Sequence, residues 1–241
     1  MPTRIAMWSG PRNISTALMR SWEARGDTAV CDEPFYAHYL AATGRNHPGR
    51  EEILAHHDSE WRSVIDFLTG PVPGGRAIFY QKHMAHHLLD GISPEFVETL
   101  DNCLLIRDPE EMLASLAKVI PDPGVEETGL PQQVMIFERL QARDGIAPPV
   151  IDSRDLLRDP PGLLRRLCDR LGVPYTDRML TWTPGPRSTD GIWARHWYAG
   201  VEMSSGFEPY RRKDETVPAH LRDRLERCRG LYERLSAHRL R

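Results

Sequence analysis

The sequence has no long apolar run and few cysteines. No stretch approaches the roughly 18 apolar residues of a membrane-spanning helix, and no basic segment followed by an apolar one opens the chain. We therefore expect no membrane span and no export signal. The four cysteines are far apart and no two have the CxxC spacing: Cys31, Cys103, Cys168 and Cys228. They predict reduced thiols in a cytoplasmic protein, with neither a disulfide framework nor a metal site.

The sequence also lacks an excess of charge of either sign. Its 31 lysines and arginines nearly balance 34 aspartates and glutamates, for a net charge of -3. This balance excludes a global attraction to nucleic acid or to an anionic membrane, so any anion site must be local. The 241 residues, 40% of them hydrophobic, can bury a sizeable core, and we expect one domain over residues 1–241.

Five short apolar runs predict the strands of a buried sheet. Helical patterns lie between them, and this alternation favours an α/β fold with a mostly parallel central sheet flanked by helices. The expected strands are 5–8, 28–31, 77–80, 103–106 and 150–151. The expected helices are 14–24, 51–68, 109–118, 132–143, 160–171 and 218–235. Several of these begin with proline or follow an aspartate or serine, as helix starts prefer.

Polar and charged residues gather where four of these strands end. In open parallel sheets the ligand lies outside the carboxyl ends of the strands. The residues at those ends are 9–10 (Ser-Gly), 32–34 (Asp-Glu-Pro), 81–83 (Gln-Lys-His) and 107–109 (Arg-Asp-Pro). Their convergence predicts a binding site at this edge of the sheet.

The first of these ends is followed by a short polar loop that suits an anion. The start of a helix has unpaired N–H groups and the positive end of the helix dipole. The loop and helix start would supply Gly10, Pro11, Arg12, Asn13, Ile14, Ser15 and Thr16. The GxxxxGK[ST] pattern of nucleoside triphosphatases is missing, and the cation here is Arg12, inside the turn.

A second anion site is indicated by Arg107 and Ser115. Arg107 leaves the end of a strand, and Ser115 lies one to two turns into the next helix, so both can face one phosphate. The alternatives are an ion pair of Arg107 with Asp108 or another carboxylate at a sheet end, and an ordinary surface position for Ser115. Two separated anion sites would fit a ligand with phosphates at two places.

The loop-like stretch 181–213 carries many aromatic residues. Half of the six tryptophans lie in it, among prolines, glycines and serines. A long loop of this composition is typical of a folded cover over a site. The alternative is a loop that its aromatic side chains simply pin to the core.

These motifs together resemble the sulfotransferases that use 3'-phosphoadenosine 5'-phosphosulfate (PAPS). Residues 11–16, PRNIST, are similar to the family's first loop, except that Ile14 stands where the family usually has glycine. Arg107 with Ser115 resembles its 3'-phosphate site. The segment 150–174, with its DLLRDP, leucine and LGVP elements, resembles a further family segment. The resemblance covers residues 4–175 and implies a P-loop-type nucleotide-binding fold with PAPS as sulfuryl donor.

The resemblance also implies catalytic residues. Asp32-Glu33-Pro34 looks like the element that supplies a glutamate base in several members, and Lys82-His83 resembles the lysine and histidine of others. We favour Glu33 as the base that deprotonates the acceptor hydroxyl or amine, with His83 as the alternative and Arg12 and Lys82 as the groups that neutralise developing charge. A further alternative for Glu33 is a cap on the next helix.

The C-terminal part adds one looser match. Arg211 and Arg212 precede the last expected helix, and the family often brings a basic segment near its C-terminus onto the 3'-phosphate. A solvated basic run is the other interpretation. The acceptor, a small molecule or saccharide, and the oligomeric state are left open by the sequence.

Three other functions compete with sulfuryl transfer. His83, His86 and His87, with His56 and His57, could form the ligand set of a metal-dependent hydrolase if residues 83–87 were helical, but HExxH is missing. A P-loop kinase would need a lysine and a Mg²⁺-binding hydroxyl in the loop. A non-catalytic nucleotide-binding protein would keep the phosphate sites and lose the base.

Overall fold

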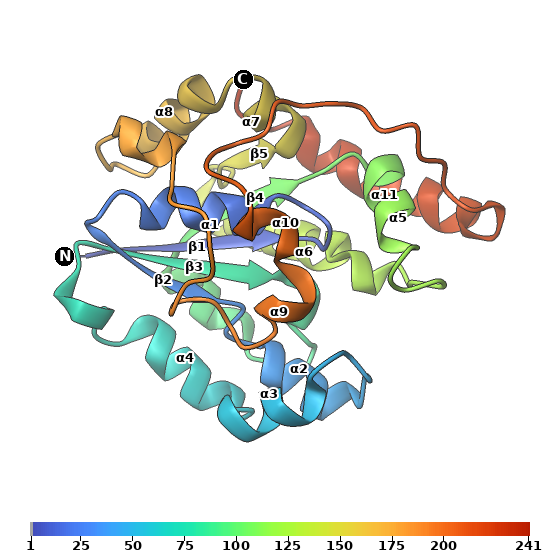
Figure 1. The fold of residues 1–241 in the computed structure, drawn as a ribbon, viewed down its shortest axis with the longest axis horizontal. Coiled ribbons are helices and arrows are strands. Elements are labelled where there is room, and N and C mark those ends of the chain that lie inside the picture. Colours follow the sequence, from blue (N-terminus) through green and yellow to red (C-terminus); the bar gives the residue numbers. More distant parts are fainter. Residues whose placement is uncertain (1) are drawn as a thin grey trace.

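Five parallel strands form the central sheet of the computed structural model, which describes residues 2–241 (Figure 1). The strand order is β2-β3-β1-β4-β5, and every pairing between these strands is parallel. The strands are β1 (Thr3–Ser9), β2 (Thr28–Asp32), β3 (Ile78–Met84), β4 (Asp101–Ile106) and β5 (Val150–Asp152). The predicted α/β fold with a parallel sheet is therefore confirmed.

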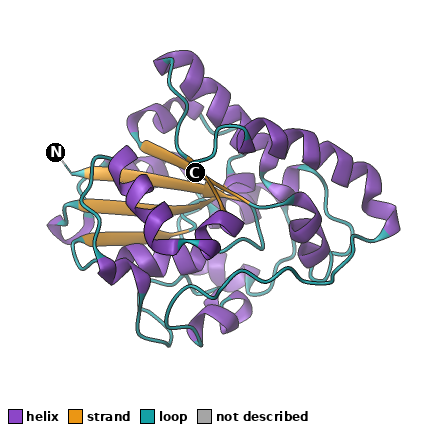
Figure 2. Cartoon of the chain, turned by 90° about the horizontal axis from the view of Figure 1, so that it is seen from above, coloured by secondary structure: helices purple, strands orange, loops and turns teal. Residues whose placement is uncertain are grey.

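Helices cover both faces of this sheet, as the view from above shows (Figure 2). Alternate side chains of a strand point to opposite faces, so Ile5 and Met7 join one apolar cluster and Ala6 and Trp8 join another. The first face is covered by α1 (Ser15–Glu23), α7 (Ser153–Arg158) and α8 (Pro160–Arg170). The second is covered by α4 (Trp61–Thr69), α5 (Pro109–Leu116), α6 (Leu130–Asp144) and α11 (Arg222–Ser236). Because both faces of the sheet are buried, the sequences of the strands are nearly continuous apolar runs.

A third apolar cluster lies apart from the two faces of the sheet. It joins α2 (Tyr36–Thr43) and α3 (Arg50–His56) to two single-turn helices of the aromatic-rich stretch, α9 (Ala194–Trp197) and α10 (Ala199–Glu202). In Figure 1, α9 and α10 lie beside the ends of the strands. Residues 181–213 therefore pack as folded structure near the edge where the polar strand ends gather.

Three expected elements differ from the structure. The predicted helix 51–68 is divided into α3 and α4, because the Asp58 side chain accepts a hydrogen bond from the backbone N–H of Glu60 (2.8 Å) and Glu60 caps α4. Strand β3 runs on to Met84, because β1 pairs with it along its whole length. Lys82 and His83 therefore lie inside the strand. The helix proposed at 83–87 is wrong, since only residues 85–87 form a short 3-10 turn.

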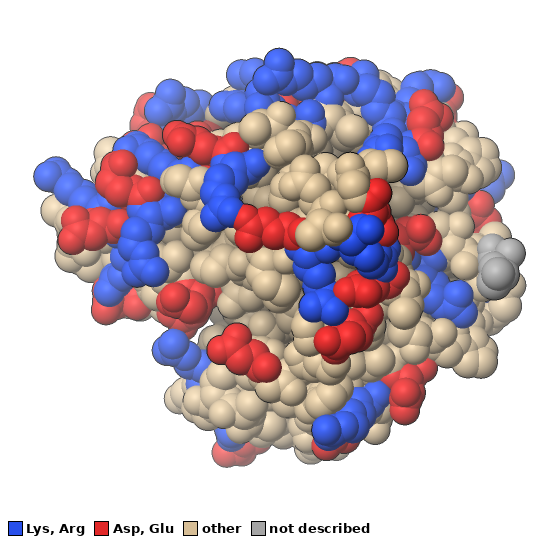
Figure 3. Space-filling view, turned by 180° about the vertical axis from the view of Figure 1, so that it is seen from behind, with Lys and Arg blue, Asp and Glu red and all other residues tan. Residues whose placement is uncertain are grey.

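The surface carries mixed charge, as the balanced composition predicts. On the face shown in Figure 3, acidic and basic side chains alternate without a large area of one sign. None of the helices within residues 2–241 combines the length and apolar character needed to cross a bilayer.

Candidate active site

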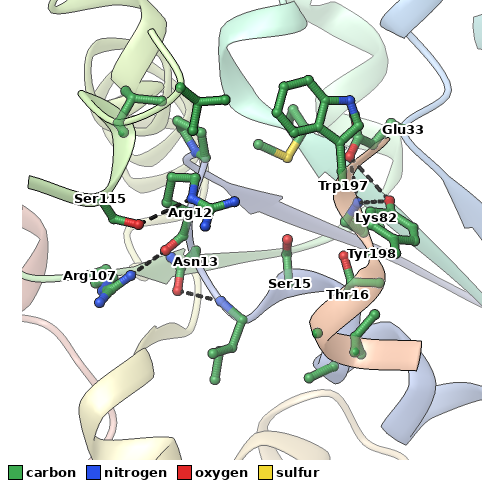
Figure 4. Close-up of a pocket in the computed structure, with 18 of the residues that line it drawn as sticks. Arg12, Asn13, Ser15, Thr16, Glu33, Lys82, Arg107, Ser115, Trp197 and Tyr198 are labelled. Carbon is green, nitrogen blue, oxygen red and sulfur yellow. Dashed lines mark hydrogen bonds and ion pairs between the residues drawn. The ribbon is translucent and has the colours of Figure 1, made fainter. Parts of the chain in front are cut away.

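A cavity of about 450 Å³ opens at the carboxyl ends of the strands. Its walls come from the loop after β1, the ends of β2 and β3, the β4–α5 junction and the stretch 181–213. Figure 4 shows side chains from these segments directed toward the same space. The cavity has the size of an ordinary small-molecule site.

The loop between β1 and α1 packs against neighbouring segments and does not block the N-terminus of α1. A Cβ at Gly10 would overlap the carbonyl oxygen of Thr128, so only glycine fits there. Asn13 donates from Nδ2 to the carbonyl of Leu105 (3.1 Å), which ties the loop to β4. Within residues 2–241 no side chain caps α1, so its first N–H groups are available to an anion.

Ile14, the departure from the family loop, has an ordinary backbone. Its φ of -85° is accessible to any residue, and its side chain packs against the apolar cluster that also contains Ile5 and Met7. The position therefore does not require glycine.

Arg107 and Ser115 meet the loop on one side of the cavity. Nε of Arg12 donates to Oγ of Ser115 (3.1 Å), and Arg107 donates to the carbonyl oxygen of Arg12. Arg107 also pairs with Glu111 (3.2 Å). The ion pair of Arg107 with Asp108 is not formed, because Asp108 instead caps α5 by accepting from the N–H of Glu110 (2.9 Å). Three polar groups from distant parts of the chain thus converge beside the helix start.

Lys82 occupies the centre of a buried network at the ends of β2 and β3. Its Nζ lies 2.8 Å from Oδ1 of Asp32, 2.6 Å from Oε1 of Glu33 and 2.6 Å from the hydroxyl of Tyr198. Burial alone would lower the pKa of Lys82, but the neighbouring negative charges outweigh it and raise the pKa well above its ordinary value. The side chain is a fixed cation within this network.

The two carboxylates of the network have different surroundings. Both oxygens of Asp32 are bonded, to Lys82 and Tyr198 and to the N–H of Gly191 (3.0 Å). Glu33 uses Oε1 for Lys82, and Oε2 has no hydrogen bond to residues 2–241. Burial raises the pKa of Glu33, and attraction to Lys82 offsets only part of that effect. Glu33 is therefore the carboxylate with a free oxygen at the cavity.

Two residues of the site have left-handed backbone conformations that favour glycine. They are Arg12, with φ of 55°, and Glu33, with φ of 43°. Among residues 2–241 they are the only non-glycine residues with positive φ. Both line the cavity.

Four expected site residues lie outside the cavity wall: Gly10, which is buried at the start of the loop, His83, Arg211 and Arg212. His83 is buried, stacks on Trp8 with ring centres 4.1 Å apart, and places Nε2 3.2 Å from Oε1 of Gln81. Burial lowers the pKa of His83 to about 3. Arg211 and Arg212 are exposed, while the next residue, Lys213, reaches the cavity.

Several residues of the site were missed by the sequence analysis. Asp32 and Tyr198 belong to the lysine network, and Tyr36, Tyr39, His47 and Trp197 line the cavity beyond it. Asp32 was marked only as one of the polar residues at a strand end and Tyr198 only as part of the aromatic-rich stretch 181–213, and neither feature assigned the residue a role in the site. In the part of the chain that the structure describes, no three His, Cys, Asp or Glu side chains are grouped to hold a metal ion. The histidines considered for a metal-dependent hydrolase therefore do not form such a group.

Two solved structures of sulfotransferases have a similar fold. The Synechococcus PCC 7002 olefin synthase sulfotransferase domain superimposes with a TM-score of 0.55 at 16% identity, over 94% of each chain. The sulfotransferase from Alicyclobacillus acidocaldarius gives a TM-score of 0.55 at 14% identity, over 100% of this chain and 98% of that one. At these identities the likeness concerns the fold.

Closer relatives in sequence are two much longer plant proteins. Branched-chain-amino-acid aminotransferase-like protein 1 of Arabidopsis thaliana is 40% identical over 238 residues, which are 98% of this chain and 42% of that protein. Protein 2 of the same name and organism is 37% identical over 97% of this chain and 41% of its own length. The chain thus spans less than half the length of these relatives. The family model for the sulfotransferase domain matches residues 3–237, and the chain belongs to the sulfotransferase domain family.

Proposed function

We propose that the chain transfers a sulfuryl group from PAPS to a hydroxyl or amine of a small acceptor and releases adenosine 3',5'-bisphosphate. The observation that carries the proposal is the pairing, across one cavity, of two anion-binding groups with a lysine–carboxylate network. We further propose that residues 2–241 act as one domain, with residues 181–213 as its cover.

The donor would bind on the side of β1 and β4. The uncapped N–H groups of α1, with the hydroxyls of Ser15 and Thr16, would hold the 5'-phosphosulfate. Arg107 and Ser115 would hold the 3'-phosphate, with Arg12 between the two groups. This placement gives Arg12 a role inside the turn, whereas the loop of a nucleoside triphosphatase has its cation, a lysine, at the start of the helix.

Transfer would then take place between the donor groups beside β1 and β4 and the lysine–carboxylate network. The acceptor oxygen forms a bond to sulfur while the bond from sulfur to the phosphate oxygen breaks, and that oxygen keeps the electron pair. Oε2 of Glu33, the free carboxylate oxygen, takes the acceptor proton. Lys82 and Arg12 stabilise the negative charge that develops on this bridging oxygen as it leaves, while Asp32 keeps Lys82 charged and in place.

Calorimetry tests the donor assignment. We expect adenosine 3',5'-bisphosphate to bind much more tightly than ATP with Mg²⁺, because the two anion groups match phosphates at the 3' and 5' positions. A preference for ATP with Mg²⁺ would replace the proposal with a P-loop kinase. Tight bisphosphate binding without sulfuryl transfer to any acceptor would favour a non-catalytic binding protein.

The cysteines support a reducing location. All four are free thiols, and Cys103, Cys168 and Cys228 are buried. Burial raises the pKa of Cys31 to about 12, which disfavours its reactive thiolate. We propose that the domain works in the cytoplasm.

A further inference from the structure

We propose that the acceptor is a small ring-bearing alcohol or phenol that carries no negative charge. This inference rests on the proposed function and concerns the half of the cavity beyond Lys82 and Glu33. The wall of this half comes from α2, the loop after it, the segment after β3 and α9: Tyr36, Tyr39, His47, His86, His87 and Trp197. In Figure 4 the donor groups Arg12, Arg107 and Ser115 lie apart from Lys82, Glu33 and Trp197.

Ring systems form a fixed wall in this acceptor half. The ring of His87 stacks against Tyr36 at a centre distance of 4.8 Å and against Tyr39 at 4.7 Å. The hydroxyl of Tyr36 bonds Nδ1 of His47 (2.9 Å), which fixes that ring as well. Such surfaces favour flat or ring-shaped molecules over flexible chains, because rings stack on rings with little loss of freedom.

Among residues 2–241, the six that form the wall of the acceptor half bring no positive charge to it. Burial lowers the pKa of His47 and of His87, and it lowers the pKa of His86 to about 3, so these imidazoles are neutral near pH 7. The charge of Lys82 is already matched by Asp32 and Glu33. Glu127 also lines the cavity, and it pairs with Arg45 (2.9 Å) and accepts from the N–H of Gly124 (2.6 Å).

An anionic acceptor would therefore lose its hydration without gaining a partner. It would also approach the excess negative charge of Asp32 and Glu33 over Lys82. An uncharged molecule avoids both costs, and a cationic one is attracted by the excess negative charge of Asp32 and Glu33. Its hydroxyl would face Oε2 of Glu33 while its ring lies along the aromatic wall.

Calorimetry with three phenols of similar size tests this inference, with the chain saturated by adenosine 3',5'-bisphosphate. The probes are 4-ethylphenol, tyramine and 4-hydroxyphenylacetate. We expect the neutral and the cationic phenol to bind at least about tenfold more tightly than the anionic one. Equal or tighter binding of 4-hydroxyphenylacetate would overturn the inference, and so would the failure of all three to bind. A chain that does not bind the bisphosphate would instead count against the proposed function.

A charge added to the wall gives an independent measurement. Val201 in α10 is half-buried, lines the cavity and packs beside the ring cluster. In Val201→Lys we expect the affinity for 4-hydroxyphenylacetate to rise about fivefold or more. Ile146→Lys adds the same charge at a residue that is 62% exposed and precedes β5, at the opposite end of the sheet, and should leave this affinity unchanged. Equal effects of the two variants would contradict the local charge argument, and the comparison of the three phenols decides the matter if Val201→Lys does not fold.

Discussion

The hydroxyl of Tyr198 lies 2.6 Å from Nζ of Lys82 and joins the stretch 181–213 to the centre of the site. The same hydroxyl is 2.7 Å from Oδ2 of Asp32 and accepts from Nε1 of Trp193 (3.2 Å). Because it accepts from Lys82 and Trp193, its single proton goes to Asp32, whose oxygens are nearer than that of Glu33 at 3.4 Å. The stretch is also held by a buried ion pair between Asp190 and Arg20 (2.6 Å). The position of the cover and the position of the lysine are thus fixed by one network.

Tyr198→Phe tests this connection. The change leaves Asp32 and Lys82 each without one partner, so we expect transfer to fall about 10- to 100-fold and the free energy of unfolding to fall by about 1–3 kcal/mol. Tyr232→Phe is the matched control, since its hydroxyl bonds Asp152 (2.5 Å) away from the cavity. It should lower the free energy of unfolding but leave the rate of transfer from bound donor unchanged. Equal losses of rate in the two variants would refute the link.

Glu33→Gln tests the base. The amide keeps the size of the side chain but cannot take a proton, so we expect transfer to fall by about 10²- to 10⁴-fold while bisphosphate affinity changes little. His83→Gln is the comparison, because His83 lies outside the cavity wall. It should lower stability through the lost stack on Trp8 and keep transfer near the wild-type rate. The reverse result in the two kinetic assays would assign the base to His83.

Arg107→Ala tests the 3'-phosphate site. Loss of a guanidinium on one phosphate should weaken adenosine 3',5'-bisphosphate by about tenfold or more and AMP, which lacks that phosphate, far less. Arg211→Ala removes the same charge from an exposed residue outside the cavity wall and serves as control. Calorimetry that showed equal loss for both nucleotides would remove Arg107 from the 3' site.

His83 also gives stability a defined dependence on pH. Its pKa in the folded chain is about 3, below the ordinary value of 6.5, because burial disfavours the charged ring. Its contribution is therefore complete above pH 6.5 and is lost as the pH falls toward 3, at about 1.4 kcal/mol per pH unit. We expect urea unfolding at several pH values between 6.5 and 5 to show that the free energy of unfolding changes less with pH in His83→Gln than in the unchanged protein, by this amount. Identical slopes in the two proteins would contradict the assignment.

The sequence predicted the parts of the fold that depend on local patterns. The five apolar strands and helix α1 follow from runs and helix starts a few residues long, and all are present. The break between α3 and α4 was missed because it depends on side-chain hydrogen bonds of Asp58 and Glu60. The full length of β3 was missed because polar residues remain in a strand when neighbours on both sides pair with it.

The candidate site divides in the same way. The sequence could predict that Arg107 and Ser115 lie close together, because only a strand end and one to two helix turns separate them. Tyr198 could not be connected to Lys82, since 116 residues separate them and only the packing of the cover brings them into contact. His83 shows the opposite error: adjacency to Lys82 suggested a shared role, but neighbouring residues of a strand face opposite sides.

The left-handed backbone of Arg12 and Glu33 has a consequence for how stable this chain can become. A non-glycine residue in that conformation costs about 1–3 kcal/mol, and glycine would relieve much of it at either position. Arg12→Gly should therefore lose less stability than the removal of its side-chain contacts alone would suggest, while Glu33→Gly would also leave Lys82 with one carboxylate fewer. The backbone conformation taken by itself would favour glycine at both positions, and the chain instead retains a charged side chain on each side of the proposed reaction, at a cost in backbone strain that glycine would avoid.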